Sequence, residues 1–141
     1  MSDQETPNRQ LLPLVRHMLL CDDVQQSTSS PQKVNVLGLL STIYVDHDAR
    51  FPVGFGCCVY VVLTEVRGPG TARVAIRAAE TETLCYLGTS HRIEFRSDPL
   101  SVYGMTFRIT HCRIPGSGLY WVEFRYNEVV LSREPILVLM R

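Results

Sequence analysis

The sequence predicts an all-β fold: an antiparallel β-sandwich of about eight strands, of an immunoglobulin-like or jelly-roll-like kind. Three observations support this prediction. Strand-like runs recur at intervals of roughly ten residues, apolar and polar residues alternate along several of them, and helix signals are nearly absent. One apolar and one polar face per strand is what antiparallel sheets around a shared core require. A closed β-barrel meets the same requirement and is the alternative.

The length of 141 residues, with 45% hydrophobic residues, suits one ordinary domain with a real core. Residues 1–12 are predicted to form a flexible N-terminal tail. Residues 13–141 are predicted to form a single β-sandwich domain, because no internal repeat and no linker interrupts them.

The first half of the domain contains three predicted strands. The first covers residues 14–23 and precedes a polar loop at 24–33, with Pro31 near its end. The second covers residues 34–45, where Gly38 indicates a bulge or a close backbone approach. After a turn at 46–52, residues 55–66 form the most apolar run. Their β-branched and aromatic residues favour a strand over a buried helix.

After a Gly-Pro-Gly turn at residues 68–70, strict alternation predicts four more strands, at 72–78, 92–96, 103–110 and 120–125. The residues expected to face the core are Ala72, Val74, Ile76, Ala78, Ile93, Phe95, Tyr103, Met105, Phe107, Ile109, Tyr120, Val122 and Phe124. A final strand is expected over 129–140, broken or bulged at Pro135. Residues 126–128 are short enough to be a hairpin turn before it.

The charge balance excludes two classes of protein. Lys+Arg and Asp+Glu each number 14, and the pI is near 6.9. A generally basic nucleic-acid binder and a polybasic membrane-surface protein are therefore excluded. No apolar run reaches the 18 residues of a membrane span, and Asp3 and Glu5 are unlike a signal peptide. We expect a cytoplasmic protein.

The cysteines point to reduced thiols. There are five, an odd number without framework spacing, and four of them lie inside strand-like runs. Cys57-Cys58 and His111-Cys112 are adjacent pairs, and neighbouring strand residues point to opposite faces. Such pairs cannot chelate one ion unless a bulge intervenes, so neither a metal nor a cofactor is expected.

Catalytic constellations are also missing. There is no GxSxG elbow, and Gly54-Phe55-Gly56 lacks the helix that a phosphate loop needs. Alternation separates Ser90 from His91. Asp46 and Asp48 could contribute to a cation site, although solvated turn residues are the better interpretation. No residue is therefore assigned a catalytic role.

The most distinctive feature is an arginine-rich polar surface. Lys33 is the one lysine, so arginine supplies 13 of the 14 basic residues. The candidate interaction residues are Trp121, Arg125, Arg73, Arg77, Arg92, Arg96 and Arg108. If their strands are adjacent in one sheet, the guanidinium groups form a docking face for an acidic partner or a nucleic acid strand. The alternative, which we favour, is an ordinary polar face on which the arginines pair with neighbouring glutamates.

Several short motifs carry a resemblance to a known family. They are Leu20-Cys21-Asp22-Asp23, Val36-Leu37-Gly38-Leu39-Leu40, Ile43-Tyr44 and the stretch GSGLYWVEF at residues 116–124. Together they resemble a family of small bacterial proteins known only as a domain of unknown function, over nearly all of residues 14–138. The resemblance implies an all-β fold and supplies no activity. The family carries Asp-Gly in its last hairpin, where Asn127-Glu128 stands here, so the register of that hairpin stays open.

Four functions remain. The preferred one is a non-enzymatic protein-interaction or assembly domain, as a homo-oligomer or with an acidic protein partner. Trp121 on a polar strand face supports it, because such a residue is either covered by a loop or part of an interface. The alternative is a module that binds a sugar, nucleotide or cation near Asp46, Asp48 and residues 115–118. A small enzyme and a nucleic-acid binder are less favoured.

Overall fold

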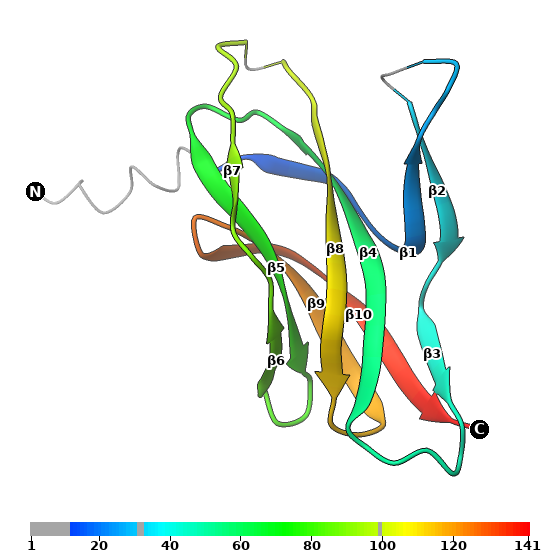
Figure 1. Cartoon of the computed structure of the whole chain (residues 1–141). Helices are drawn as coiled ribbons and strands as arrows, with labels where there is room; N and C mark the ends of the chain where they lie inside the picture. The colour runs from blue at the N-terminus through cyan, green and yellow to red at the C-terminus, as the bar shows by residue number, and fades with distance from the viewer. Residues whose placement is uncertain (1–11, 31–32, 99) are drawn as a thin grey trace, which may run out of the picture.

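Two β-sheets packed face to face make up the fold (Figure 1). The computed structural model describes residues 12–30, 33–98 and 100–141. Apart from Leu12, the predicted tail of residues 1–12 lies outside the described residues, as does Pro31. None of the described residues belongs to a helix long and apolar enough to cross a membrane.

Ten strands run through the described residues. They are β1 (Leu14–Gln26), β2 (Val34–Leu39), β3 (Thr42–Val45), β4 (Val53–Thr64), β5 (Gly70–Ala78), β6 (Leu84–Leu87), β7 (His91–Ile93), β8 (Tyr103–Ile114), β9 (Gly118–Tyr126) and β10 (Val129–Met140). Sheet A has the order β2-β1-β4-β8, and sheet B has the order β3-β10-β9-β5-β6, with β7 also paired to β5. The predicted sandwich is confirmed, and the sheets do not close into a barrel.

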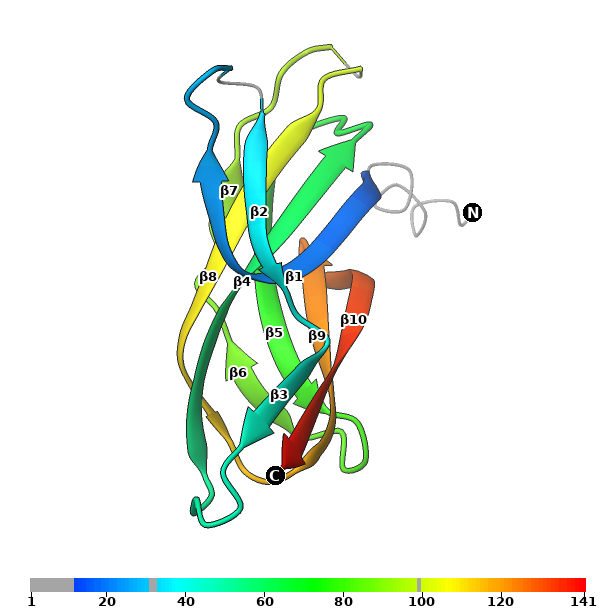
Figure 2. The ribbon, with the colours of Figure 1, turned by 90° about the vertical axis from the view of Figure 1, so that its right-hand side faces the viewer.

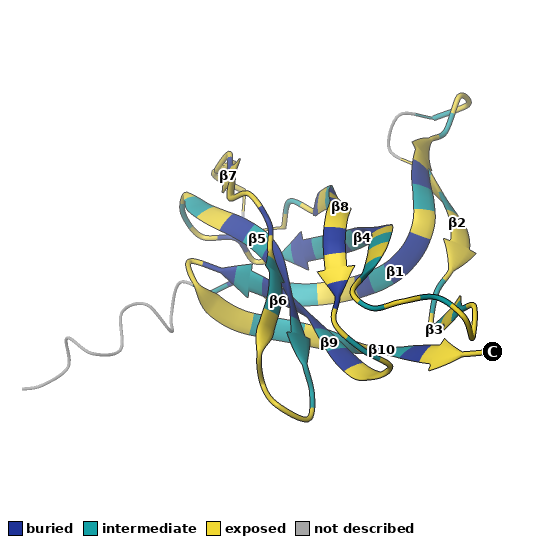
Figure 3. Cartoon of the chain, turned by 60° about the horizontal axis from the view of Figure 1, so that its bottom comes forward, coloured by how far each residue is buried: buried dark blue, intermediate teal, exposed yellow. Residues whose placement is uncertain are grey.

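The core lies between the two sheets, and the predicted alternation positions it. Figure 3 shows buried and exposed residues following each other along β8. Along β9 from Tyr120 onward the core-facing residues are buried, while Trp121 and Arg125 are half-buried. Phe107 of sheet A and Phe124 of sheet B meet here, with ring centroids 5.8 Å apart. Burying large apolar side chains of this kind contributes about 1.5–3 kcal/mol each relative to exposure.

The prediction of one strand over residues 34–45 is wrong, because the chain changes sheets in the middle. The Leu40 amide donates to Leu20 of sheet A, whereas Ser41 accepts from the Leu137 amide of sheet B. Gly38 precedes the crossing with a φ of +69°, a left-handed conformation that glycine adopts without steric cost. Figure 2 shows β2 and β3 following each other as the chain passes between the sheets.

Two further differences concern sheet B. The strand expected over residues 92–96 is reduced to β7, and Phe95 lies beyond it, 44% exposed rather than in the core. β6 was not predicted, because its four residues show no clear alternation. With the divided second strand, β6 raises the predicted eight strands to the ten described.

The last hairpin turns at Asn127-Glu128. Asn127 and Glu128 both adopt positive φ, at 49° and 65°, as a two-residue type I′ turn requires. Tyr126 then pairs with Val129. β10 is continuous through Pro135, and its bulge lies at residues 130–132 instead. Proline is tolerated there because β3 joins β10 only from Leu137 onward, which leaves an edge at Pro135.

Candidate functional site

The outer surface of sheet B gathers most of the predicted interaction residues. The register between β5 and β9 places Arg73 opposite Arg125, and Arg77 opposite Trp121. The register between β9 and β10 adds Arg133 opposite Glu123. Residues opposite each other on antiparallel strands share a face. We call the set Arg73, Arg77, Trp121, Glu123, Arg125 and Arg133 the arginine face.

Glu123 is the buried centre of this surface. It is 5% exposed, and it accepts hydrogen bonds from Arg77 Nε at 3.1 Å and from Arg125 Nη2 at 2.8 Å. Burial opposes the charged carboxylate and is the largest single influence on its pKa. The hydrogen bonds from Arg125 and Arg77 together outweigh burial, so the pKa of Glu123 lies below its usual value. The carboxylate therefore stays ionised and links Arg77 of β5 to Arg125 of β9.

A second acid neutralises Arg73. Its Nη2 lies 2.8 Å from Glu128 Oε1, and the Glu128 side chain is 54% exposed. Glu128 occupies the second position of the β9–β10 turn, where its positive φ is unusual for a residue with a side chain. Arg73, Arg77 and Arg125 thus pair with their own glutamates, as the sequence analysis favoured.

Trp121 is covered by a neighbouring side chain. It is half-buried, and the Arg133 guanidinium carbon lies 4.1 Å from the centroid of its ring. Among the described residues, no carboxylate forms an ion pair with Arg133. Arg133 is not among the predicted interaction residues, because the bulge at residues 130–132 changes which residues of β10 point outward.

The arginine face continues into an apolar strip toward β3. Leu139 lies opposite Tyr44 in the parallel β3–β10 pair, and Leu119 and Leu139 are each 39% exposed. The Arg141 guanidinium carbon lies 4.0 Å from the Tyr44 ring centroid. Two arginine–aromatic stacks, Arg133 on Trp121 and Arg141 on Tyr44, therefore lie on sheet B. The exposed Leu119 and Leu139 lie on the same sheet.

Of the other predicted arginines, Arg92 lies on the outer side of sheet B, because it pairs with Thr71, two residues from Arg73 on β5, whereas Arg96 and Arg108 lie elsewhere. Arg108 lies on β8 of sheet A, opposite Cys58. Arg92 is an exposed residue of β7, and Arg96 follows that strand, with its guanidinium carbon 4.6 Å from the Tyr103 ring centroid. The condition that all these strands are neighbours in one sheet is not met, because β8 forms the far edge of the opposite sheet.

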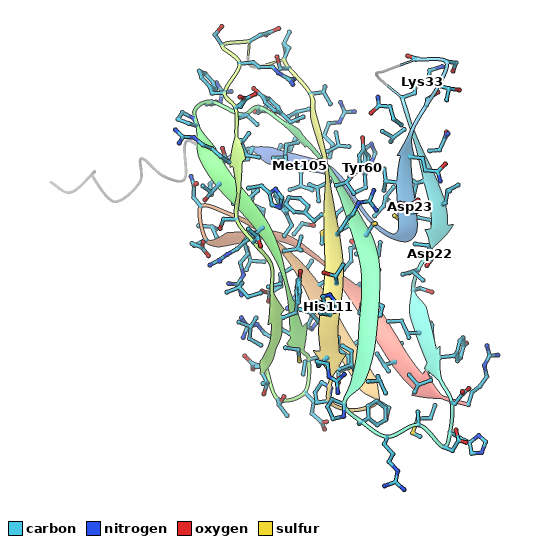
Figure 4. All side chains as sticks on the ribbon, in the orientation of Figure 1. Asp22, Asp23, Lys33, Tyr60, Met105 and His111 are labelled. Atoms are coloured by element: carbon cyan, nitrogen blue, oxygen red, sulfur yellow. The ribbon has the colours of Figure 1, made fainter. Side chains whose placement is uncertain are left out.

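Arg108 instead links β8 to β4 and to the end of β1 within sheet A. Its Nη1 donates to Asp23 Oδ1 at 2.9 Å and to Cys58 Sγ at 3.1 Å. Its Nη2 donates to the Val24 carbonyl at 3.4 Å, and the hydrogen bond from Arg108 lowers the pKa of the Asp23 carboxyl. Asp23 lies where β1 turns toward the hairpin (Figure 4). Arg108 thus has a structural role on sheet A.

The five cysteines are all free thiols, distributed over both faces of sheet A and over sheet B. Cys57 points into the main core, whereas the adjacent Cys58 packs with Cys21 and Val24 in a second cluster on the other face. Burial raises the pKa of Cys57 to about 12 and that of Cys112 to about 11. These thiols are therefore poor nucleophiles near neutral pH.

We expect the thiols to react in two classes. In native protein at pH 8, Ellman's reagent should label Cys85 within minutes, because Cys85 is only half-buried. The four buried thiols should react when guanidinium chloride unfolds the chain. Absorbance at 412 nm measures both phases, and Cys85→Ser should remove the fast one. Rapid labelling of Cys57 or Cys112 in the native protein would contradict this burial.

The side chains of the remaining candidate sites do not lie close enough together to form a site. Among the described residues, no three His, Cys, Asp or Glu side chains gather where they could hold a metal ion. His91 meets the edge of Phe107, with ring centroids 5.4 Å apart. His111 is exposed at a bulge in β8, with a φ of 59°. In the described part of the chain, neither histidine hydrogen-bonds to a carboxylate.

The loop predicted to hold a small ligand lines a shallow cavity. It has a volume of about 250 Å³, and residues 115–120 line it together with Ala78, Glu80 and Thr81. Asp46 and Asp48 do not contribute. They lie in the turn after β3, where the Ala49 amide donates to the Asp46 carbonyl.

Comparison with known proteins identifies a family. No curated protein is significantly similar to the chain. Among solved structures, the β-glucosidase from Listeria innocua gives a TM-score of 0.49 at 13% identity over 87% of this chain, and its complex with glucose gives 0.50 at 11% over 86%. This chain spans 16% of that enzyme, and the likeness concerns the fold alone. A family model described as a family of unknown function, DUF6941, matches residues 16–139. Because this match covers most of its length, the chain belongs to the DUF6941 family.

Proposed function

We propose that this protein is a non-enzymatic interaction domain that binds an acidic partner protein on the arginine face. The observation that carries the proposal is the charge count of that surface. Four guanidinium groups, on Arg73, Arg77, Arg125 and Arg133, are matched by only two carboxylates, on Glu123 and Glu128. The face therefore keeps an excess of positive charge although the whole chain is neutral.

The placement of the charges supports the same partner. Glu123 is buried beneath the guanidinium groups that it binds, so an approaching protein meets arginine first. The Arg133 guanidinium lies over the Trp121 ring, a contact that lowers the entropy lost when Arg133 binds a carboxylate. Arginine, tryptophan and tyrosine are also the residues most often found at the energetic centres of protein interfaces.

We place this role in the cytoplasm. The five free thiols, four of them buried in apolar surroundings, agree with a reducing compartment. Binding there takes place at about 0.15 M salt, where charges farther apart than about 8 Å are largely screened. The partner must therefore bring its acidic residues into direct contact with the arginines.

A labelled deca-glutamate peptide tests the charge preference directly. We expect Arg133→Ala combined with Arg73→Ala to weaken its binding at least about twofold in fluorescence anisotropy, because each lost contact contributes about 0.2–1 kcal/mol. Arg113→Ala is the matched control, since Arg113 is exposed on sheet A and, among the described residues, donates only to the Pro52 carbonyl. It should bind as the wild type does.

Three outcomes would count against an acidic protein partner. The first is equal loss of peptide binding in the Arg113→Ala control. The second is tighter binding of a labelled oligothymidine, which would favour nucleic acid. The third is a stable dimer in light scattering that Trp121→Ala converts to a monomer, which would assign the face to homo-oligomer assembly.

A further inference from the structure

β8 is an edge strand, and the two halves of its free edge differ in how well they are protected from pairing with another strand. It spans twelve residues and pairs with β4 on one side only. Unpaired edge strands present free N–H and C=O groups that can accept another strand, and proteins commonly protect such edges with bulges or charged residues. The two halves of β8 differ in this protection.

The half of β8 toward Ile114 is protected. The Tyr86 hydroxyl of β6 hydrogen-bonds to the Thr110 backbone. A bulge lies opposite residues 55–57 of β4, and His111 takes a positive φ there. His111 marks this lower half in Figure 4, whereas Met105 marks the upper half. A strand could not run straight along this lower edge.

The half of β8 between Tyr103 and Arg108 keeps a regular register with β4. The Ile109 carbonyl lies toward β4, against Gly56. Since the backbone groups of successive residues point to opposite sides of a strand, those of Met105 and Phe107 also point to β4. The N–H and C=O groups of Gly104, Thr106 and Arg108 point to the open side.

A groove of about 540 Å³ lies along this open edge, between β8 and the segment that contains β7. Ile93, Tyr103 and Phe107, all buried at least nine-tenths, form its apolar floor, and Met105 lines its wall. Arg92, Glu94 and Arg96 line the opposite rim, so two arginines and one glutamate stand there. Among the described residues, no carboxylate forms an ion pair with either arginine.

We infer that this edge binds an extended peptide segment of a partner protein by strand addition. The segment would pair with Gly104, Thr106 and Arg108, a length of about five residues at roughly 3.4 Å each. Its alternate side chains would be apolar, facing Ile93 and Phe107, and one acidic residue would face Arg92. The occupant is a peptide because only a polypeptide backbone matches alternating donors and acceptors along a strand edge.

A selection with linear dodecapeptides displayed on phage tests this inference. The wild type is the target, and Thr106→Pro is used for counter-selection. Proline removes the Thr106 N–H, which is not bonded to β4, so the edge is blocked while the sheet is retained. We expect the selected peptide, once synthesised and labelled, to bind Thr106→Pro at least about tenfold more weakly, and Thr106→Val as tightly as the wild type.

Amide hydrogen exchange gives a second measurement. Binding should slow exchange at Gly104, Thr106 and Arg108, while Met105 and Phe107, already paired with β4, should change little. If circular dichroism shows that Thr106→Pro is unfolded, Met105→Lys replaces it, because an inward charge in the groove also opposes strand addition. Arg133→Ala should leave peptide binding unchanged, which separates this site from the arginine face.

The inference is wrong if no peptide is enriched over the counter-selected variant, or if the selected peptides bind the edge variants as tightly as the wild type. Uniform protection along β8, without the two-residue period, would also overturn it. A peptide whose binding depends on Arg133 rather than Thr106 would belong to the arginine face instead.

Discussion

We expect Glu123→Gln to lower the free energy of unfolding by about 2–4 kcal/mol. Removing one partner of a buried ion pair typically costs about 3–5 kcal/mol, and the partial exposure of Arg77, at 31% of its side chain, reduces that figure. Glutamine keeps the shape and one acceptor oxygen. It leaves Arg77 and Arg125 without a counter-charge between adjacent strands. Equilibrium unfolding in guanidinium chloride at pH 7 measures the difference.

The effect of Glu123→Gln should depend on pH. The folded-state pKa of Glu123 lies below the usual value of 4.5, so the folded chain binds this proton less readily than the unfolded chain. The stabilisation is therefore complete above about pH 4.5 and is lost as the pH falls through the folded-state pKa. Below that range the wild type and Glu123→Gln should converge in stability.

Glu128→Gln is the matched control on the same sheet. Glu128 makes an equally short contact with Arg73, but its side chain is 54% exposed. Exposed pairs of this kind contribute about 0–1 kcal/mol, so we expect a loss of less than about 1 kcal/mol. If the two glutamine variants are equally stable at pH 7, the buried position of Glu123 has no energetic importance.

Gly38→Ala should have an effect of similar size, for two separable reasons. The φ of +69° disfavours any residue with a Cβ by roughly 1–2 kcal/mol. A Cβ at this position would also collide with the Asp22 carboxylate, which lies at the bend of β1 (Figure 4). Together we expect a loss of about 2–4 kcal/mol in the free energy of unfolding.

A double-mutant cycle separates the two causes. Asp22→Ala removes the colliding carboxylate, so the Asp22→Ala/Gly38→Ala variant should be less destabilised than the sum of the single variants by about 1 kcal/mol. Gly54→Ala is the control, because a Cβ there meets no atom within 4 Å and the φ is ordinary. A Gly38→Ala variant as stable as Gly54→Ala would show that neither cause operates.

Much of the sandwich could be predicted from the sequence, because alternation is a local property. Val122 and Phe124 face the core as expected, and Trp121 faces outward, since each lies on a long strand with an apolar and a polar side. The turn at Asn127-Glu128 was also predictable from its length. What alternation cannot show is which sheet a strand joins.

That limit explains the errors at the candidate site. Arg77 and Arg108 follow the same local pattern, but one strand lies in sheet B and the other at the far edge of sheet A. Arg133 was missed because a bulge shifts the phase of β10. Leu40 and Ser41 are neighbours in sequence, yet Leu40 hydrogen-bonds to sheet A and Ser41 to sheet B. Pairing with distant strands, rather than the identity of either residue, determines this difference.

The parallel pair of β3 and β10 also bears on how the chain is made. Thr42 of β3 pairs with Leu137, which the ribosome adds 95 residues later. During synthesis β3 is therefore unpaired with β10 while the strands between them emerge and begin to pair. Contacts between such distant residues form slowly, because closing a long loop costs entropy before the contact is gained. We therefore expect the β3–β10 pair to form after the antiparallel pairs of sheet B.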